Sequence, residues 1–410
     1  MLQNKVPNVR FSKYLDIWKT TKLKMIAEII GGGTPDTKQS YYWNGDINWF
    51  SPTEVGKTVY LTKSEKTITQ LGLQKSSAKL LPAFKTILFT SRAGIGDVGI
   101  LTEESATNQG FQSLVVNEET DVYFLYSYSD KIKKYALKHS AGSTFLEISG
   151  KELGKMDLSI PSLQEQSAIG SLFRTLDELL ASYKDNLANY QSLKATMLSK
   201  MFPKAGQTVP EIRLDGFEGE WEVQTLKELA SFSKGNGYTK NDLVNSGKEI
   251  ILYGRLYTDY QTLISQVNTF VTKVKANAVI SKGGEVIVPA SGESAEDISR
   301  ASVVEKSGVI LGGDLNIIYP DENKVDSIFL ALTISNGSQQ KELIKRAQGK
   351  SVVHLRNNDL EKVVLHYPSM EEQRAIGSYF LNLDNLINSY QEKISQLETL
   401  KKKLLQDMFV

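Results

Sequence analysis

The stretch Ile160-Pro-Ser-Leu-Gln-Glu-Gln-Ser-Ala-Ile-Gly-Ser-Leu-Phe173 decides how this chain is organised, because a near copy of it occurs later. It returns as Tyr367-Pro-Ser-Met-Glu-Glu-Gln-Arg-Ala-Ile-Gly-Ser-Tyr-Phe380, at an offset of 207 residues (367 minus 160). The register holds without a gap to Met201-Phe202 in the first copy and Met408-Phe409 in the second. We interpret the chain as two related halves.

A weaker repeat lies near the start of each half. Val6 to Trp18 matches Val209 to Trp221 at an offset of 203 residues (221 minus 18), including Arg10 and Arg213. About 140 residues separate the two kinds of repeat in each half, and these variable regions have diverged. A duplicated frame that carries two unlike inserts is typical of one protein that recognises two different things.

The composition is that of an ordinary globular protein. The 410 residues are 40% hydrophobic and 23% charged, with no cysteine and a net charge of +1. This length predicts two or three domains, and the missing cysteines exclude disulfides and thiolate metal sites. The N-terminus resembles no signal peptide, and no apolar run reaches the ~20 residues that span a bilayer. We therefore expect a cytoplasmic protein that does not contact a membrane, and any binding to nucleic acid must rest on local basic patches.

Apolar residues after each box recur with the spacing of a heptad repeat, which predicts two long helices. The intervening faces are polar, so each helix needs a partner, and the other copy is the nearest of equal length. The order of the chain favours an antiparallel coiled coil with pseudo-two-fold symmetry. Phe173 and Leu180, with Phe380 and Ile387, widen the apolar stripe. The principal residues of the predicted seam, also candidates for partner binding, are Ile169, Leu176, Leu179, Tyr183, Ile376, Leu383, Leu386 and Tyr390.

The variable regions read as short strands separated by Gly, Ser and Asn turns, so the fold class is mixed α and β. Each region is predicted to close with an amphipathic helix, near 123–139 and 325–346. The predicted domains are a first globular domain with its N-terminal extended box, the first long helix, a linker with a second globular domain, and the second long helix. Their respective boundaries are 1–158, 159–203, 204–365 and 366–410.

No motif in the chain predicts catalysis. Gly94-Ile-Gly-Asp-Val-Gly99 spells a dinucleotide-binding pattern, but no helical periodicity follows it, so a turn between strands is the better interpretation. Asp314, Glu322 and Lys324 form a weak nuclease-like set in a polar turn context. The three histidines, His139, His354 and His366, lack the spacing of metal ligands.

Basic and aromatic residues gather in corresponding parts of the two variable regions, which favours contacts with phosphates and base edges. Any single lysine is more often part of a solvated helix face, so the clusters carry the interpretation. The candidate DNA-binding residues are Ser91, Arg92, Lys131, Lys134, Lys138, Ser143, Arg255, Tyr257, Lys345, Arg346, Lys350 and Ser351.

Two copies of the Pro-Ser-Leu/Met-x-Glu-Gln-x-x-Ile box, each opening a heptad helix after a divergent region, resemble the specificity subunit of type I restriction–modification systems. Gly31-Gly-Gly-Thr-Pro35 also resembles the start of that family's recognition domain, whereas Lys234-Gly-Asn-Gly-Tyr238 departs from it. The resemblance implies a prokaryotic, non-catalytic subunit in which two target recognition domains read a bipartite duplex DNA sequence.

The same resemblance implies partners and cofactors. The helices would dock two methyltransferase subunits that bind S-adenosylmethionine. Two restriction subunits, translocating nucleases that use ATP and Mg²⁺, would join them, and this chain would bind no cofactor or metal itself. Two alternatives remain open at this point. One is a coiled-coil scaffold that binds proteins without DNA sequence specificity, and the other is an enzyme with an unrecognised site.

Overall fold

The computed structural model describes residues 6–92, 94–142, 146–349 and 352–409. The chain divides into two compact units. The first unit is Met1–Asp185 together with Glu392–Val410, and the second is Asn186–Gln391. Each unit therefore contains one variable region and a segment of both long helices. The fold is mixed α and β, as predicted.

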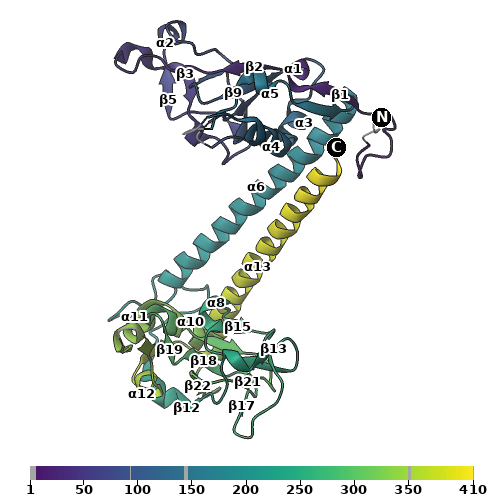
Figure 1. The fold of residues 1–410 in the computed structure, drawn as a ribbon. Coiled ribbons are helices and arrows are strands. Elements are labelled where there is room, and N and C mark those ends of the chain that lie inside the picture. Colours follow the sequence, from purple (N-terminus) through teal and green to yellow (C-terminus); the bar gives the residue numbers. More distant parts are fainter. Residues whose placement is uncertain (1–5, 93, 143–145, 350–351, 410) are drawn as a thin grey trace. The chain divides into compact units, whose positions relative to one another are not determined.

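The first unit is built on a five-stranded sheet in the order β2-β9-β6-β7-β4, and a three-stranded sheet in the order β5-β3-β8 adjoins it (Figure 1). Strand β6 is buried along its whole length, which explains its continuous run of Thr, Ile, Leu and Phe. A separate antiparallel pair, β1 with β10, leads into the first long helix. The strands are β1 (Lys19–Lys22), β2 (Ala27–Gly31), β3 (Trp43–Phe50), β4 (Tyr60–Leu61), β5 (Lys66–Ile68), β6 (Thr86–Phe89), β7 (Val98–Leu101), β8 (Ser105–Thr107), β9 (Gln112–Val116) and β10 (Asp157–Ile160), and the helices are α1 (Leu23–Ile26), α2 (Gln70–Gln74), α3 (Val122–Ser127), α4 (Ser129–His139) and α5 (Gly150–Leu153).

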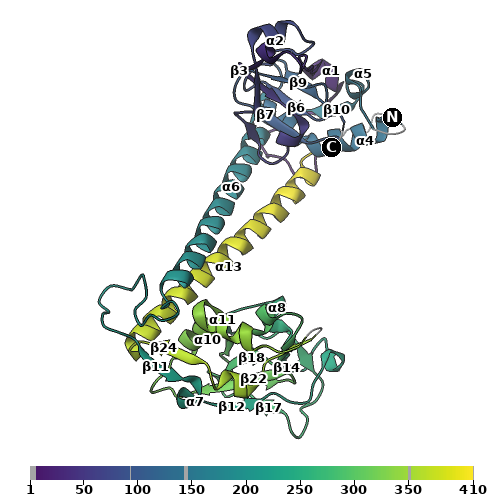
Figure 2. The same cartoon turned by 90° about the vertical axis from the view of Figure 1, so that its left-hand side faces the viewer.

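The second unit repeats this plan with a different elaboration. Its main sheet has the order β12-β22-β18-β20-β15, and a second five-stranded sheet has the order β13-β16-β14-β21-β17. Helices α10 and α11 lie alongside strands β18 and β22 of the main sheet (Figure 2). Its strands are β11 (Glu222–Thr225), β12 (Ala230–Lys234), β13 (Leu243–Val244), β14 (Lys248–Ile251), β15 (Leu263–Ile264), β16 (Phe270–Val271), β17 (Val279–Ile280), β18 (Val286–Pro289), β19 (Ser291–Gly292), β20 (Ser302–Val304), β21 (Ile310–Leu311), β22 (Leu315–Pro320), β23 (Val353–His354) and β24 (Val364–Tyr367), and its helices are α7 (Leu226–Leu229), α8 (Arg255–Thr258), α9 (Ala295–Ile298), α10 (Ser327–Ser335), α11 (Gly337–Arg346) and α12 (Asn357–Leu360).

The single amphipathic helix predicted to close each variable region is two helices in both cases. In the first unit the break falls at Tyr128, whose ring is buried and whose hydroxyl donates to the Ser159 carbonyl at 2.5 Å. In the second unit Asn336 leaves the helical conformation and Gly337 takes a φ of +68°. The sequence prediction missed both breaks because apolar residues continue across them.

Two long helices carry the repeated boxes. They are α6 (Leu163–Lys200) and α13 (Met370–Asp407), each of 38 residues. In the first unit Lys401 pairs with Asp177 and Lys184 with Glu398, so partner numbers fall on α13 as they rise on α6. The two helix segments of the first unit are therefore antiparallel.

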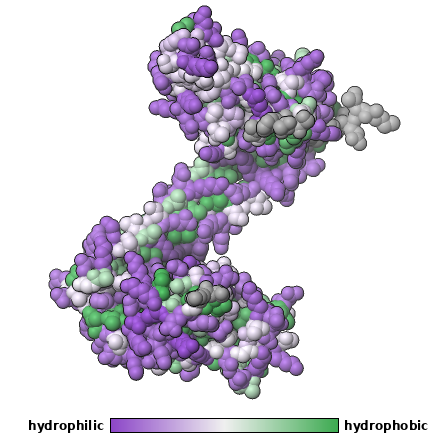
Figure 3. Space-filling view, turned by 60° about the vertical axis from the view of Figure 1, so that its left-hand side comes forward, coloured by the Kyte–Doolittle hydropathy of each residue, from purple (hydrophilic) through white to green (hydrophobic). Residues whose placement is uncertain are grey.

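The helix segments of the second unit are antiparallel as well. Lys194 pairs with Asp384, and the rings of Tyr190 and Tyr390 lie 5.5 Å apart between centroids. Apolar patches follow the helices in the space-filling view (Figure 3), so their stripes are only partly covered by each other.

The buried row on each helix is displaced from the predicted seam. Leu179 and Leu386 are 36% and 42% exposed, whereas Leu180 and Ile387, next in sequence, are 7% and 9% exposed. The residues that were predicted only to widen the apolar stripe therefore lie at its centre. On α6 the buried positions are 169, 173, 176 and 180, which face the interior of the first unit. Four residues of the predicted seam are buried as expected: Ile169, Leu176, Ile376 and Leu383. The side chains of Tyr183 and Tyr390 are partly exposed.

The repeated box joins each long helix to the weaker repeat at the start of its half. Arg10 holds Glu165 through two hydrogen bonds of 2.7 Å, from Nε and Nη2, and Glu165 is 1% exposed. Arg213 holds Glu372 in the same way at 2.7 and 2.6 Å. The hydrogen bond to Glu165 raises the pKa of Arg10. The two glutamates therefore dock the N-terminal boxes.

The glutamine that follows each glutamate forms hydrogen bonds with the backbone of the variable region of its own half. Gln166 donates to the Glu119 carbonyl at 3.2 Å and accepts from the Asp121 backbone at 3.1 Å, and Asp121 then caps α3. Gln373 holds the Lys324 carbonyl and the Asp326 backbone in the same way, and Asp326 caps α10. The repeated Glu-Gln pair is thus structural.

The tail of each long helix completes the core of a variable region. Phe409, which follows α13, is 5% exposed in the first unit and packs against the rings of Phe124, Tyr128 and Phe173. In the second unit Phe202, which follows α6, packs in the same way against the rings of Trp221, Phe329 and Phe380. Within its own unit, each variable region is therefore closed by the helix that starts in the other half of the sequence.

Candidate nucleic-acid interface

Each unit has a cluster of loops where the central strands of its main sheet end. In the first unit β6 runs into Thr90-Ser91-Arg92, and the Ser91 amide donates to the Gly110 carbonyl at 2.8 Å, which ties this loop to the start of β9. Gly33 donates to the Thr107 carbonyl at 2.8 Å and brings the loop after β2 to the same edge. Segments far apart in sequence therefore meet at one edge of the sheet.

The hairpin after α4 adds to this cluster. Ala141 and Glu147 form its base through two backbone hydrogen bonds of 3.0 Å, and Glu147 bridges to Arg92 across the strands. The side chains of Arg92 and Glu147 lie 4.0 Å apart and both are partly exposed. Ser143, predicted to bind DNA, lies outside the described residues. Arg92 is thus at the surface, where a ligand can reach it.

The second unit builds the same arrangement. Strand β19, which follows β18, pairs with β23 of the segment after α11, and Gln348 and His354 exchange backbone hydrogen bonds of 3.1 and 2.8 Å. Lys350 and Ser351 sit between those two residues in sequence and lie outside the described residues. In both units, therefore, the segment after the basic helix pairs with the residues that follow the central strand of the main sheet.

The lysines of α4 lead toward this cluster. Lys131, Lys134 and Lys138 occupy positions i, i+3 and i+7, which share one helix face, and α4 ends directly before the hairpin. Lys134 and Lys138 are exposed, and Lys131 lies over the Tyr128 ring at 5.8 Å from its centroid. This face can follow a phosphate backbone.

Helix α11 has an equivalent but shorter basic face. Lys341 and Lys345 are exposed at positions i and i+4, while Arg346 pairs with Glu342 at 2.8 Å. A groove of about 850 Å³ lies beside this helix, bordered also by Lys362 and by the residues after α6. Lys341 lies four residues before Lys345 and extends this basic face by one turn.

Two residues predicted to contact DNA have side chains that the fold largely encloses. Ser91 is fully buried, and its backbone rather than its side chain joins the neighbouring loops. The side chain of Arg255 is 10% exposed, with its guanidinium held by Gln261 at 3.1 Å and by the Gln266 carbonyl at 2.9 Å. Both residues hold loops in place, a role that their sequence context does not distinguish from ligand binding.

Tyr257 lies in a groove of about 860 Å³ in the second unit that Tyr253 and Asp314 also line. Burial, followed by the neighbouring Tyr253, raises the pKa of the Tyr257 hydroxyl. The hydroxyl can act as a hydrogen-bond donor at this surface.

The motifs set aside in the sequence are structural. Gly94 and Gly96 have φ of +119° and +97° in the turn between antiparallel β6 and β7, so they form the predicted turn and no nucleotide site. Asp314 and Glu322 lie at opposite ends of β22, too far apart to share a metal ion. Within the described ranges no three His, Asp or Glu side chains gather as metal ligands, and no helix is long and apolar enough to cross a membrane.

Comparison with known proteins identifies the class. A family model described as the type I restriction modification DNA specificity domain matches residues 16–189 and again residues 218–399. The chain therefore belongs to this family and carries two copies of its domain, which confirms the resemblance seen in the sequence.

Similar proteins share this family. The chain is 24% identical over 401 residues to the type I restriction enzyme MjaIX specificity subunit of Methanocaldococcus jannaschii, covering 95% of this chain and 91% of that one. It is 30% identical over 179 residues to the EcoR124I/EcoR124II specificity subunit of Escherichia coli, covering 42% and 43%. That these relatives are named specificity subunits supports the prediction that the chain is not an enzyme.

Solved structures show the same fold. The crystal structure of a type I restriction–modification S subunit from M. genitalium superposes with a TM-score of 0.63 at 15% identity, covering 99% of both chains. A structure reported for the assembly and conformational transition of a type I system gives a TM-score of 0.50 at 17% identity, covering 95% of this chain and 96% of that chain.

Proposed function

We propose that this chain is the DNA-reading subunit of a type I restriction–modification complex, in which each variable region recognises one half of a bipartite duplex sequence. The observation that carries the proposal is the duplicated placement of a lysine-bearing helix, the hairpin that follows it, and the strand-end loops that receive the hairpin. Lysines on α4 and α11 would hold phosphates, and the divergent loops would read base edges.

The proposed arrangement of the long helices is an antiparallel coiled coil with pseudo-two-fold symmetry. Its support is the pairing within each unit, where the partner numbers of α6 and α13 add up to the same value: 177 with 401, and 194 with 384. Helices of 38 residues at 1.5 Å per residue are about 57 Å long, so they would set the distance between the two half-sites.

The proposed partners are two methyltransferase subunits, which would bind S-adenosylmethionine, and two restriction subunits, which would use ATP and Mg²⁺. Exposed leucines on the helices are candidates for methyltransferase docking. They are Leu179 and Leu400 in the first unit and Leu193 and Leu386 in the second, and the 207-residue offset relates one set to the other. Two equivalent docking positions would follow from that relation.

A protein-binding scaffold without DNA specificity is the alternative. The exposed leucines are compatible with it, but nothing in a scaffold requires basic helices that lead into divergent loops in both units. The experiment that separates the two functions is an exchange of residues 20–158 for the equivalent region of another family member. We expect the methylated DNA sequence of the assembled complex to change in one half-site only, as read by mapping modified bases. An unchanged sequence, or a change in both halves, would contradict the proposal.

The lysine face of α4 gives a second test. Exchanging Lys134 and Lys138 for glutamate should weaken DNA binding by the assembled complex for all sequences alike. Because each phosphate contact contributes about 0.9 to the slope of log K against log salt, the slope should fall by about two. Lys24→Glu, at an exposed lysine of α1, is the matched control. Anisotropy titrations across salt concentrations measure the slope, and an unchanged slope would exclude this face.

A further inference from the structure

Asp314, in the turn that opens β22, carries a carboxylate that has no partner in the described part of the chain. Its side chain is exposed, and no described residue holds it by a hydrogen bond or an ion pair. The backbone around it is fixed, because the Asp314 carbonyl accepts from the Ala290 amide at 2.8 Å. The next carbonyl, of Leu315, accepts from the Gly235 amide at 2.9 Å. The position is therefore anchored at the loop edge of the main sheet, while the carboxylate remains available to a ligand.

The carboxylate borders the groove of about 860 Å³ that Tyr253 and Tyr257 also line. Neutral hydrogen-bonding side chains, among them Asn241 and Asn268, surround the groove, and Lys240 is the one lysine among its described lining residues. A surface that follows a phosphate backbone needs several cations, whereas base edges are read by hydrogen-bonding side chains. The composition of this groove therefore suits base edges.

The first unit has an arginine beside the place that this aspartate takes in the second unit. Gly110 is equivalent to Asp314, because its carbonyl accepts from the Ser91 amide at 2.8 Å in the same strand register. A Cβ atom on Gly110 would lie 2.8 Å from Pro52 and 3.7 Å from Nε of Arg92. The first unit thus has no room for a side chain at this position and offers the partly exposed Arg92 instead.

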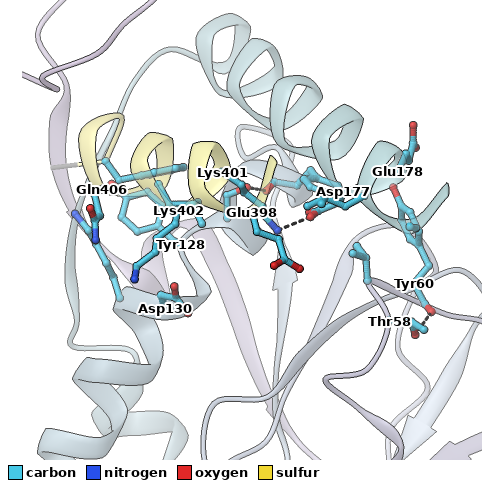
Figure 4. A pocket seen from close by; sticks show the side chains of 18 of the residues that line it. Thr58, Tyr60, Tyr128, Asp130, Asp177, Glu178, Glu398, Lys401, Lys402 and Gln406 are labelled. Carbon is cyan, nitrogen blue, oxygen red and sulfur yellow. Dashed lines mark hydrogen bonds and ion pairs between the residues drawn. The ribbon is translucent and has the colours of Figure 1, made fainter. Parts of the chain in front are cut away.

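A carboxylate that holds the fold together has partners, as Asp177 shows. It lies in a groove of about 730 Å³ beside the helices of the first unit (Figure 4). Asp177 accepts from the Tyr123 hydroxyl at 2.8 Å and pairs with Lys401. Asp314 makes no such contact with any described residue, so the fold does not account for its charge.

An ionised carboxylate only accepts hydrogen bonds, which restricts what it can meet on DNA. Phosphates repel it, and guanine and thymine present no donor in the major groove. Adenine presents its N6 amino group there, but its N7 acceptor lies alongside and would face the second carboxylate oxygen. Cytosine presents the N4 amino group without an adjacent acceptor of its own, so it is the base that suits a carboxylate.

We propose that Asp314 selects a cytosine in the half-site of the second variable region, by accepting a hydrogen bond from the N4 amino group of that base. This inference rests on the proposed function and goes beyond it by naming one base and the residue that selects it. The first half-site is not read in this way, since the arginine at the equivalent place has only donors.

The test is Asp314→Asn in the full chain, assembled with the methyltransferase subunit and used to select bound DNA from a library randomised in the second half-site. Asparagine pairs with N6 and N7 of adenine, so one position of this half-site should change from cytosine to adenine. Affinity for the original sequence should fall by about 5- to 150-fold, the usual effect of one mismatched base pair. Asp314→Gly should leave the position without a preference. Both replacements tolerate the φ of +58° at residue 314, so the unfolding temperature should hold.

Glu322→Gln is the matched control, because Glu322 is exposed beyond the opposite end of β22 and its replacement removes the same charge. It should leave both half-sites unchanged. A wild-type second half-site without cytosine, or an unchanged half-site in Asp314→Asn, would overturn the inference. An equal change of affinity for all sequences would reveal mere repulsion of phosphates and overturn it as well. A wild-type complex that selects no bipartite sequence would refute the proposed function, and the inference would fall with it.

Discussion

Phe409→Ala should destabilise the first unit by about 3–5 kcal/mol, the usual cost of removing a buried aromatic ring. The Phe409 ring centroid lies 5.5 Å from that of Phe124, 4.6 Å from Tyr128 and 5.7 Å from Phe173, and nothing else in the described part of the chain occupies its place. Phe409 is far in sequence from the N-terminal variable region, yet we expect its substitution to destabilise that region. Denaturation followed by hydrogen exchange, which reports on each unit separately, measures it.

Two variants define the specificity of this effect. Phe202→Ala should produce the same loss in the second unit and spare the first. Leu400→Ala, 45% exposed on α13, should change stability by no more than about 0.5 kcal/mol. A loss near 1 kcal/mol for Phe409→Ala, or a loss spread evenly over both units, would show that the tail does not belong to the core of the first unit.

Arg10→Ala should cost about 3–5 kcal/mol, because it leaves the carboxylate of Glu165 buried without its charged partner. Arg10 also donates to the Asp16 carbonyl at 2.6 Å, and the Trp18 indole lies 3.4 Å from Glu165, so the entire N-terminal box depends on this pair. Limited proteolysis near residue 10 should accelerate together with the loss of stability seen in urea denaturation.

The charge and not the side-chain volume is the expected cause. Replacing both partners, as Arg10→Met with Glu165→Leu, should recover most of the stability, since no buried charge remains. Lys22→Ala removes an ion pair with Asp157 whose partners are 46% and 65% exposed, and should cost about 1 kcal/mol or less. If the double variant were as unstable as Arg10→Ala, packing rather than charge would hold the box.

The duplication and the two long helices could be predicted from the sequence because both depend on spacing along the chain. The centre of the apolar stripe could not, since Leu179 and Leu180 are equally apolar and only the pairing of the helices turns one inward. The breaks at Tyr128 and Asn336 were missed for a similar reason: tertiary packing ends the helix there, whereas the apolar pattern runs on.

The candidate interface was predictable only in part. Lys134 and Lys138 were predicted to bind DNA because basic residues recur on one helix face, and the structure leaves both side chains exposed. Ser91 and Arg255 were chosen by residue type, which does not reveal that one is fully buried and the other is held by neighbouring loops. The Arg10 pair had a signal in the repeat at offset 203, but residue spacing does not tell which glutamate an arginine will meet.

The joints between the variable regions and the long helices have a consequence for inheritance. Each joint consists of a capping aspartate held by glutamine and an aromatic socket for a Met-Phe tail, and both halves make it from the same residue types. A gene segment encoding a foreign variable region, exchanged between the two repeated boxes, would bring its own capping aspartate and its own part of the aromatic socket with it. New specificities can therefore be acquired by recombination in one step, without compensating mutations in the helices.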